Sequence, residues 1–323
     1  MPDELLKIEG LKTHFHTFAG VIKAVDGVDF HLDEGEILGV VGESGCGKSV
    51  LGFSIMGLVD PPGRIESGRI EFDGRDLARL QERDLRKIRG REIAMIFQDP
   101  MTSLNPLYTV QEQMEEVMRL HAKMSAGQRK RRCIELLGEV GISQPESRLK
   151  NYPHQFSGGM RQRVIIAIAL ASSPKLVIAD EPTTALDVTI QAQILKLMKR
   201  LVTEHRTAMM LITHDLAVVS EMADRIVVMY CGRIVEKGPR EAIVHRCRHP
   251  YTLGLLGSIP KLVSRQKRLR QIPGMVPDVM NLPPGCAFAP RCASAKTLCR
   301  EKRPELEALE PGQEAACFYP VGR

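Results

Sequence analysis

Eight consecutive residues are of the types needed to hold the phosphates of a nucleotide. They fit the pattern G-x-x-x-x-G-K-[ST] and are Gly42, Glu43, Ser44, Gly45, Cys46, Gly47, Lys48 and Ser49. Glycines let backbone N–H groups face the phosphates, the lysine ammonium reaches the terminal phosphates, and the serine hydroxyl can ligate Mg²⁺. Apolar runs at residues 37–41 and 50–58 predict the strand and the helix that this loop requires on its two sides. A glycine-rich turn that binds nothing is the weaker interpretation.

Two carboxylates, Asp180 and Glu181, follow an apolar run at residues 176–179. In a parallel sheet, a buried strand delivers the side chains at its carboxyl end beside the phosphate loop. There Asp180 would hold Mg²⁺ directly or through water, and Glu181 would polarise the water that attacks the terminal phosphate. Seen alone, two acids at a strand end are as often solvated turn residues. The phosphate loop upstream favours the functional interpretation.

A second phosphate-binding surface is predicted at Ser157, Gly158 and Gly159, which precede a helical pattern at residues 160–171. A hydroxyl and backbone N–H groups at the start of a helix bind anions. A simple helix cap would explain the serine but would not require two successive glycines. One ATP cannot contact both this segment and the phosphate loop within one chain.

The elements that must position these residues alternate between short strands and helices, which is typical of an α/β protein with a largely parallel sheet. The predicted strands are residues 36–41, 68–72, 93–97, 176–179, 208–212 and 225–229. A helical insert interrupts them, with helices predicted at 111–124 and 128–140. After Gly238 and Pro239 the strands give way to a helix and then to a stretch rich in Pro and Gly. We predict a nucleotide-binding domain at 1–240 and a smaller C-terminal extension at 241–323.

The composition is that of an ordinary globular protein, with 43% hydrophobic and 26% charged residues. The longest apolar run, residues 164–171, is far too short to cross a bilayer, and the acidic first residues lack the apolar core of a signal peptide. We therefore expect a cytosolic protein. The formal net charge of +6 is spread over 323 residues and mostly predicts solvated faces, including the basic run at 265–270.

The order of the motifs resembles the ATP-binding subunits of ABC transporters. That order comprises the phosphate loop, Gln98, Phe156–Met160, Asp180-Glu181, Ala185-Leu186-Asp187 and Thr213-His214-Asp215. The resemblance implies an α/β ABC ATPase fold: a RecA-like P-loop core with an antiparallel β subdomain and a helical signature subdomain at about 101–165. In that family two such domains face each other head to tail and trap two ATP molecules. Each ATP lies between one subunit's phosphate loop and the other's Ser-Gly-Gly helix, which accounts for the two phosphate-binding surfaces.

The resemblance also implies roles for single residues. Gln98 would contact Mg²⁺ or the attacking water and relay the nucleotide state to a membrane partner. His214 would contact the γ-phosphate and orient Glu181, and Asp187 would lie at the dimer interface. Taken alone, Gln98 would be an exposed strand-end residue and His214 a boundary residue.

Four aromatic or apolar residues bear on the adenine position and on the signature segment. Phe15 aligns with the aromatic residue that stacks on adenine, although Phe18 is close and both could be core residues. Phe156 and Met160 replace the leucine and the glutamine that are usual in the family's signature. Because Ser157 and both glycines remain and Glu181 is present, we expect a site that hydrolyses ATP.

Three segments, at residues 23–28, 98–106 and 249–252, resemble the ATPases of dipeptide and oligopeptide importers. This implies a peripheral subunit at the cytoplasmic face of the cell membrane that powers import. Its implied partners are a second ABC ATPase subunit, identical or related, two transmembrane permeases and an extracytoplasmic substrate-binding protein, with no nucleic acid. The same subfamily also includes nickel and glutathione importers.

Four cysteines crowd the last forty residues with the spacing C-x5-C-x6-C-x17-C: Cys286, Cys292, Cys299 and Cys317. Four thiolates can hold Zn²⁺ or an iron-sulfur cluster. The spacing matches neither the common zinc pairs nor the ferredoxin patterns, so by itself it leaves cluster, zinc and unliganded thiols open. Some members of the importer family that this region resembles bind a [4Fe-4S] cluster here. The resemblance therefore implies a [4Fe-4S] cluster in preference to Zn²⁺.

Two other classes of protein compete with the importer interpretation. ABC ATPases that act on DNA or ribosomes tend to carry coiled-coil insertions or two ATPase units, and this chain predicts neither. A kinase or GTPase with a phosphate loop leaves the Ser-Gly-Gly segment and His214 unexplained.

Overall fold

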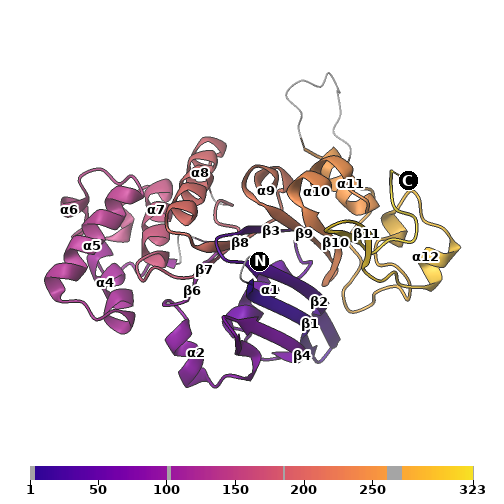
Figure 1. Cartoon of the computed structure of the whole chain (residues 1–323), viewed down its shortest axis with the longest axis horizontal. Coiled ribbons are helices and arrows are strands. Elements are labelled where there is room, and N and C mark those ends of the chain that lie inside the picture. Colours follow the sequence, from indigo (N-terminus) through magenta and orange to yellow (C-terminus); the bar gives the residue numbers. More distant parts are fainter. Residues whose placement is uncertain (1–3, 100–102, 185, 260–270, 323) are drawn as a thin grey trace. The chain divides into compact units, whose positions relative to one another are not determined.

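The computed structural model describes residues 4–99, 103–184, 186–259 and 271–322 (Figure 1), and by its internal contacts the chain divides into two compact units. Unit 1 comprises residues 33–36 and 80–211, and unit 2 comprises residues 4–32, 37–79 and 212–322. Unit 1 contains the acid pair and the Ser-Gly-Gly segment. Unit 2 contains the phosphate loop and the C-terminal cysteines. The basic run at 265–270 lies outside the described residues.

Unit 2 contains a four-stranded sheet with the order β2-β1-β4-β5. Its strands are β1 (Glu4–Thr17), β2 (Gly20–Asp33), β4 (Gly63–Phe72) and β5 (Arg75–Asp76). β1 pairs antiparallel with β4 and sets Leu6 opposite Phe72, and both side chains are fully buried. This sheet corresponds to the antiparallel β subdomain that the resemblance implies.

A second set of strands in unit 2 has the order β11-β12-β10-β9-β3. The strands are β3 (Ile37–Val41), β9 (Arg225–Tyr230), β10 (Arg233–Pro239), β11 (Glu307–Glu310) and β12 (Gln313–Ala315). β3 is buried along its whole length and runs parallel to β9. β10 pairs antiparallel with both β9 and β12. Strands from the two sides of the predicted boundary at 240 therefore share one sheet.

Short helices and turns complete unit 2. They are α1 (Lys48–Met56), η1 (Leu77–Arg79), α9 (Leu216–Met222), α10 (Arg240–Arg246), α11 (Pro250–Gly257), η3 (Ala289–Arg291) and α12 (Thr297–Glu301). α9 packs closely on β3, because a Cβ atom at Gly39 would lie only 2.0 Å from Val219 Cγ1. The strand that leads into the phosphate loop is thereby fixed from one face.

Unit 1 contains strands in the order β8-β7-β6. They are β6 (Ile93–Ile96), β7 (Leu176–Asp180) and β8 (Ala208–Thr213), whose last two residues belong to unit 2. β6 and β7 run parallel with Ala94 opposite Val177, and β7 and β8 are buried along their whole lengths. The strands predicted from the apolar runs at 93–97, 176–179 and 208–212 are therefore confirmed.

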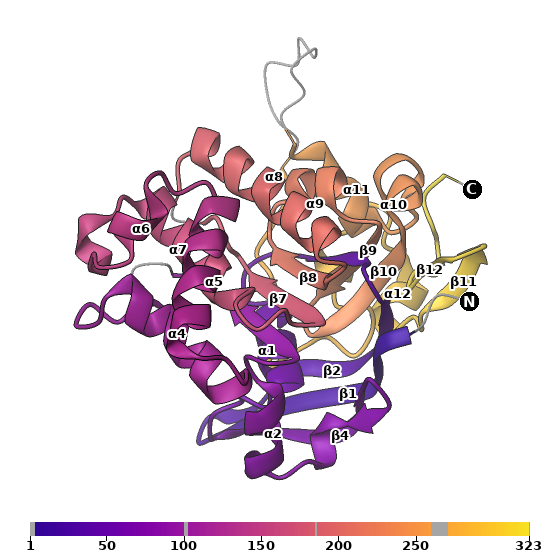
Figure 2. The same cartoon turned by 60° about the vertical axis from the view of Figure 1, so that its left-hand side comes forward.

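The helices of unit 1 are α2 (Glu82–Ile88), α4 (Val110–His121), α5 (Ala126–Glu139), α6 (Pro145–Arg148), α7 (Gly158–Ala169) and α8 (Val188–Glu204), with a turn η2 (Pro153–Gln155). Figures 1 and 2 show α4, α5, α6 and α7 gathered into one helical group, and the helices predicted at 111–124 and 128–140 are present as α4 and α5 with shifted bounds. Thr109 and Ser125 open α4 and α5 with reciprocal capping boxes. No helix in the described part of the chain is both long and apolar enough to cross a membrane.

Candidate functional site

The phosphate loop connects β3 to α1 in unit 2. Lys48 is 4% exposed, and its Nζ donates hydrogen bonds to the carbonyl oxygens of Gly42 at 2.8 Å and Glu43 at 3.0 Å. Gly47 has φ 99°, and a Cβ atom there would lie 1.9 Å from the carbonyl oxygen of Ala24. Only glycine fits that position, both for its backbone conformation and for its space. The loop thus has the closed turn and the inward lysine that phosphate binding requires.

The acid pair stands at the carboxyl end of β7 in unit 1. Asp180 is 2% exposed, while Glu181 is half-buried and has a left-handed backbone with φ 46°. The Glu181 carboxylate accepts hydrogen bonds from Gln98 Nε2 at 3.2 Å and from the Thr184 hydroxyl at 2.7 Å. The structure therefore brings together two of the predicted site residues that are 83 positions apart. Strained backbone of this kind is frequent at functional sites.

Thr184 is a neighbour of Glu181 that sequence reasoning missed. Its hydroxyl donates to the carboxylate and its backbone N–H donates to the carbonyl oxygen of Glu181 at 3.3 Å, which closes a turn after β7. A hydroxyl residue three positions after a strand-end acid is the only sequence signal that could have indicated this contact.

The Ser-Gly-Gly segment forms the exposed start of α7. Ser157 is the N-cap, and its hydroxyl accepts a hydrogen bond from the backbone N–H of Met160 at 3.4 Å. A Cβ atom at Gly159 would lie 2.8 Å from Ile190 Cγ2, so this glycine also allows α7 to approach α8. Asp187 caps α8 through a hydrogen bond from the backbone N–H of Ile190 at 3.0 Å. Both helix starts belong to unit 1.

The remaining residues predicted to bind the nucleotide lie in unit 2. His214 is exposed just after β8, and Asp215 caps α9 by accepting a hydrogen bond from the backbone N–H of Ala217 at 2.8 Å. Phe15 is half-buried at the end of β1 with its ring packed on Gly63, whereas Phe18 is fully exposed between β1 and β2. The adenine-stacking role of Phe15 stays a prediction.

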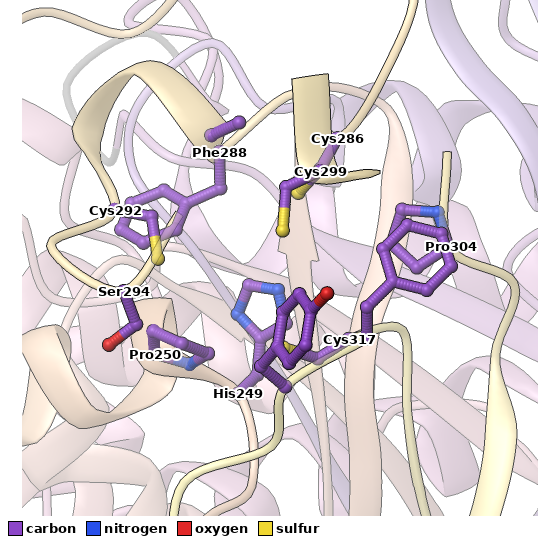
Figure 3. A pocket seen from close by; sticks show the side chains of 12 residues that line it. His249, Pro250, Cys286, Phe288, Cys292, Ser294, Cys299, Pro304 and Cys317 are labelled. Atoms are coloured by element: carbon purple, nitrogen blue, oxygen red, sulfur yellow. The ribbon is translucent and has the colours of Figure 1, made fainter. Parts of the chain in front are cut away.

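The four clustered cysteines line a single pocket of unit 2 together with His249, Phe288 and Tyr319 (Figure 3). Cys299 is buried and the other three thiols are half-buried. Burial raises the pKa of Cys286 and Cys292, and it raises the pKa of Cys317 to about 11. Among the described residues, no group of three or more His, Cys, Asp or Glu side chains is arranged to hold a metal ion.

Comparison with known proteins places these features in a family. The model "ABC transporter" matches residues 25–184, and the model "Oligopeptide/dipeptide transporter, C-terminal region" matches residues 235–299. The dipeptide transport ATP-binding protein DppD of Escherichia coli K12 is 50% identical over 317 residues, which cover 98% of this chain and 97% of DppD. The chain belongs to the ABC-type peptide transport ATP-binding proteins. The family resemblance predicted from the motif order is thereby confirmed.

Other relatives of this ABC ATP-binding protein support the same assignment. The oligopeptide transport ATP-binding protein AppD of Bacillus subtilis 168 is 52% identical, and the match covers 97% of this chain and 96% of AppD. Among solved structures, the dimeric post-hydrolysis state of the ATP-binding cassette MJ0796 with ADP and Pi matches with a TM-score of 0.66 and 29% identity. That match covers 73% of this chain and 99% of the cassette. The predicted ABC cassette fold is confirmed.

Proposed function

We propose that this chain is the ATP-hydrolysing subunit of an importer of dipeptides and oligopeptides. The observation that carries the proposal is similarity over almost the whole chain to proteins named as dipeptide and oligopeptide transport ATP-binding proteins. The phosphate loop agrees with it, because Lys48 and Gly47 have the geometry of a nucleotide site. Nickel and glutathione import, and action on nucleic acid, are not favoured by these relatives.

ATP would be held by backbone N–H groups of residues 42–49 and by the ammonium of Lys48, with Phe15 stacked on adenine. Ser49, Gln98 and Asp180 offer hard oxygen ligands that suit Mg²⁺, whose charge would neutralise the phosphates. Glu181 would accept a proton from the attacking water. The hydrogen bonds from Gln98 and Thr184 would orient the Glu181 carboxylate for that transfer.

A second ATPase subunit would complete each nucleotide site. Ser157, Gly158 and Gly159 stand at an exposed helix start, which is suited to bind the γ-phosphate of an ATP held on a partner. Asp187, which caps α8, would lie at the same interface, and His214 would contact the γ-phosphate within its own subunit. The similar cassette MJ0796 is described as dimeric, which supports the proposal.

The membrane partners would be two permeases, and an extracytoplasmic binding protein would select the cargo. Apolar side chains close to the segment at 98–106 are exposed, with Leu107 at 80% and Tyr108 at 51%. Such exposed apolar residues are typical of a protein interaction surface. We place the chain at the cytoplasmic face of the cell membrane, docked to permease helices through this region.

We further propose that the extension at 241–323 holds a [4Fe-4S] cluster on Cys286, Cys292, Cys299 and Cys317. The support for this proposal is that the four thiols line one pocket, since four thiolates can hold an iron-sulfur cluster or, as the alternative, Zn²⁺. Such a group would cross-link loops of the extension. Anaerobic purification with iron, sulfide and zinc analysis tests this, and colourless protein with stoichiometric zinc would exclude the cluster.

The transport function is tested with the chain co-purified with its permeases and reconstituted in proteoliposomes. We expect ATP-dependent uptake of a labelled dipeptide when the binding protein is present, and no uptake with Lys48→Ala. Uptake of Ni²⁺ or glutathione in place of peptides would overturn the proposed cargo. Co-purification with nucleic acid in place of membrane subunits would overturn the proposed function itself.

A further inference from the structure

The first variable residue of the phosphate loop, Glu43, is held from the C-terminal region. Its carboxylate accepts two hydrogen bonds from the guanidinium of Arg291, at 2.6 Å from Nη1 and 2.9 Å from Nη2. Its backbone N–H donates to the hydroxyl oxygen of Tyr251 at 2.8 Å. The side chain and the backbone N–H of Glu43 are therefore both held by residues more than 200 positions away in the sequence. All three residues belong to unit 2.

The Arg291 side chain is buried and is held by several neighbours. Its side chain is only 4% exposed, and it ends the turn η3 one residue before Cys292. Its Nε donates to the carbonyl oxygen of Pro273 at 3.0 Å, and its guanidinium lies about 6 Å from the ring centres of Tyr230 and Phe288. The hydrogen bonds to Glu43 and Tyr230 keep the pKa of Arg291 above its ordinary value. The two parallel hydrogen bonds between the Arg291 guanidinium and the Glu43 carboxylate, made in a buried site, hold the two side chains in one relative orientation.

The Tyr251 side chain is also held in one position by its neighbours. It is fully buried and packs on Tyr230 with ring centres 4.7 Å apart and on Phe288 at 5.4 Å. Its place at the start of α11 is set by His249, whose Nδ1 accepts the backbone N–H of Tyr251 at 3.1 Å. The backbone N–H of His249 in turn donates to the buried Glu236 of β10 at 3.0 Å. The hydroxyl of Tyr251 therefore presents a fixed acceptor to the phosphate loop.

The contacts of Arg291 and Tyr251 with Glu43 affect both the charge and the order of the phosphate loop. A phosphate loop binds a polyanion, so an unpaired carboxylate on the loop repels the ligand. A loop that is ordered only on binding also loses affinity through the entropy of ordering. The paired guanidinium of Arg291 cancels the charge of Glu43, and the two anchors together fix the start of the loop before ATP arrives.

We propose that Arg291 and Tyr251 are positioning residues for the phosphate loop, through which the C-terminal region sets the affinity of the loop for ATP. The inference rests on the proposed function of the loop as an ATP site. If the wild-type chain fails to bind ATP, the proposed function fails. If the wild type binds ATP and the variants below bind it equally well, only this inference fails.

The test measures the dissociation constant of Mg-ATP by calorimetry on the full-length chain. Arg291→Met should weaken ATP binding about 10- to 100-fold, the range expected when a hydrogen-bonded partner of a charged group is lost. Tyr251→Phe, which removes one oxygen and keeps the ring, should weaken it about 2- to 10-fold. In steady-state hydrolysis the KM for ATP should rise while kcat at saturating ATP stays within about twofold.

Rescue separates positioning from a general structural role. Adding Glu43→Gln to Arg291→Met removes the unpaired carboxylate and should recover most of the lost affinity, whereas a merely misfolded variant would not recover. Arg248→Met is the matched control, because Arg248 is a half-buried arginine of the same region whose guanidinium pairs with Glu310 and donates to the carbonyl oxygens of Val321 and Gly322. Iron and zinc contents are compared across variants, because Arg291 neighbours Cys292. Wild-type affinity in folded Arg291→Met and Tyr251→Phe, or no rescue by Glu43→Gln, would overturn the proposal.

Discussion

The substitution Glu181→Gln isolates the proposed chemical step from folding and binding. In the wild type the Glu181 carboxylate accepts hydrogen bonds from Gln98 and Thr184. A glutamine has the same length, and its amide oxygen can accept both bonds, but it cannot take a proton from water. The left-handed backbone with φ 46° is equally strained for either residue. The variant therefore removes the negative charge and the basicity of the side chain while it keeps the length and an acceptor oxygen.

These contacts fix the expected magnitudes. Because both hydrogen bonds can be retained, the free energy of unfolding should change by less than about 1 kcal/mol. General-base catalysis contributes about 10²- to 10⁴-fold, so kcat should fall by that factor, which corresponds to about 3 to 5 kcal/mol in the activation barrier. The affinity for Mg-ATP should stay near the wild-type value, since the phosphate loop is untouched.

The assay compares phosphate release, Mg-ATP binding and ATP-dependent dimerisation of the wild type, Glu181→Gln and a control. Glu135→Gln is a suitable control because that carboxylate is 61% exposed on α5. Glu181→Gln should accumulate as an ATP-bound dimer on size exclusion, since closure without hydrolysis cannot be reversed by turnover. A kcat within tenfold of the wild type in the folded variant would refute the assignment of Glu181 as the base.

Three further perturbations have defined outcomes. Gly47→Ala should abolish measurable ATP binding in calorimetry and lower the melting temperature, because φ 99° costs a non-glycine residue about 1–2 kcal/mol and the new Cβ would lie 1.9 Å from a carbonyl oxygen. Ser157→Ala should lose about 1 kcal/mol of stability with its helix cap and still bind ATP, yet stay monomeric with Mg-ATP on size exclusion; a normal dimer would contradict the predicted role. Burial alone would raise the pKa of Asp26, but the hydrogen bond and charge of Arg233 outweigh burial and hold that pKa below the ordinary 3.8. Because folding favours the ionised form of Asp26, this carboxylate stabilises the folded state fully above about pH 4, and the stabilisation is lost as the pH falls further. The free energies of unfolding of the wild type and Asp26→Asn, measured with urea, should therefore differ at pH 7 and converge toward pH 3.

The parts of the fold that were predictable are those encoded locally. The apolar run that became β7 has no polar interruption, and the capping boxes at Thr109 and Ser125 mark where α4 and α5 begin. β1 and β2 were not predicted as strands. β1 pairs irregularly with β4 between Glu9 and Lys12, and its register is set by that partner, whose paired residues lie 48 to 66 positions further along the chain. A strand whose pattern is broken in this way becomes recognisable only beside its neighbour.

In the candidate site, too, the local motifs were predictable and the long-range contacts were not. The phosphate loop, the acid pair and Ser157 are short motifs whose chemistry follows from neighbouring residues. The contact of Arg291 with Glu43 joins residues 248 positions apart, and no local pattern around either residue indicates it. The segment at 249–252 was noticed only as a family resemblance, and the contact of its Tyr251 with the loop required the structure.

The close approach of Gly159 to Ile190 has an evolutionary consequence. Gly159, the second residue of α7, was predicted for the phosphate that it would face, but it also leaves room for a branched side chain of α8. Related chains should therefore show covariation, with a smaller residue at the position of Ile190 wherever the second glycine is replaced. Loss of function on replacing Gly159 would then reflect displaced helices as well as a lost ligand contact. Only a paired substitution that trims Ile190 could separate the two contributions.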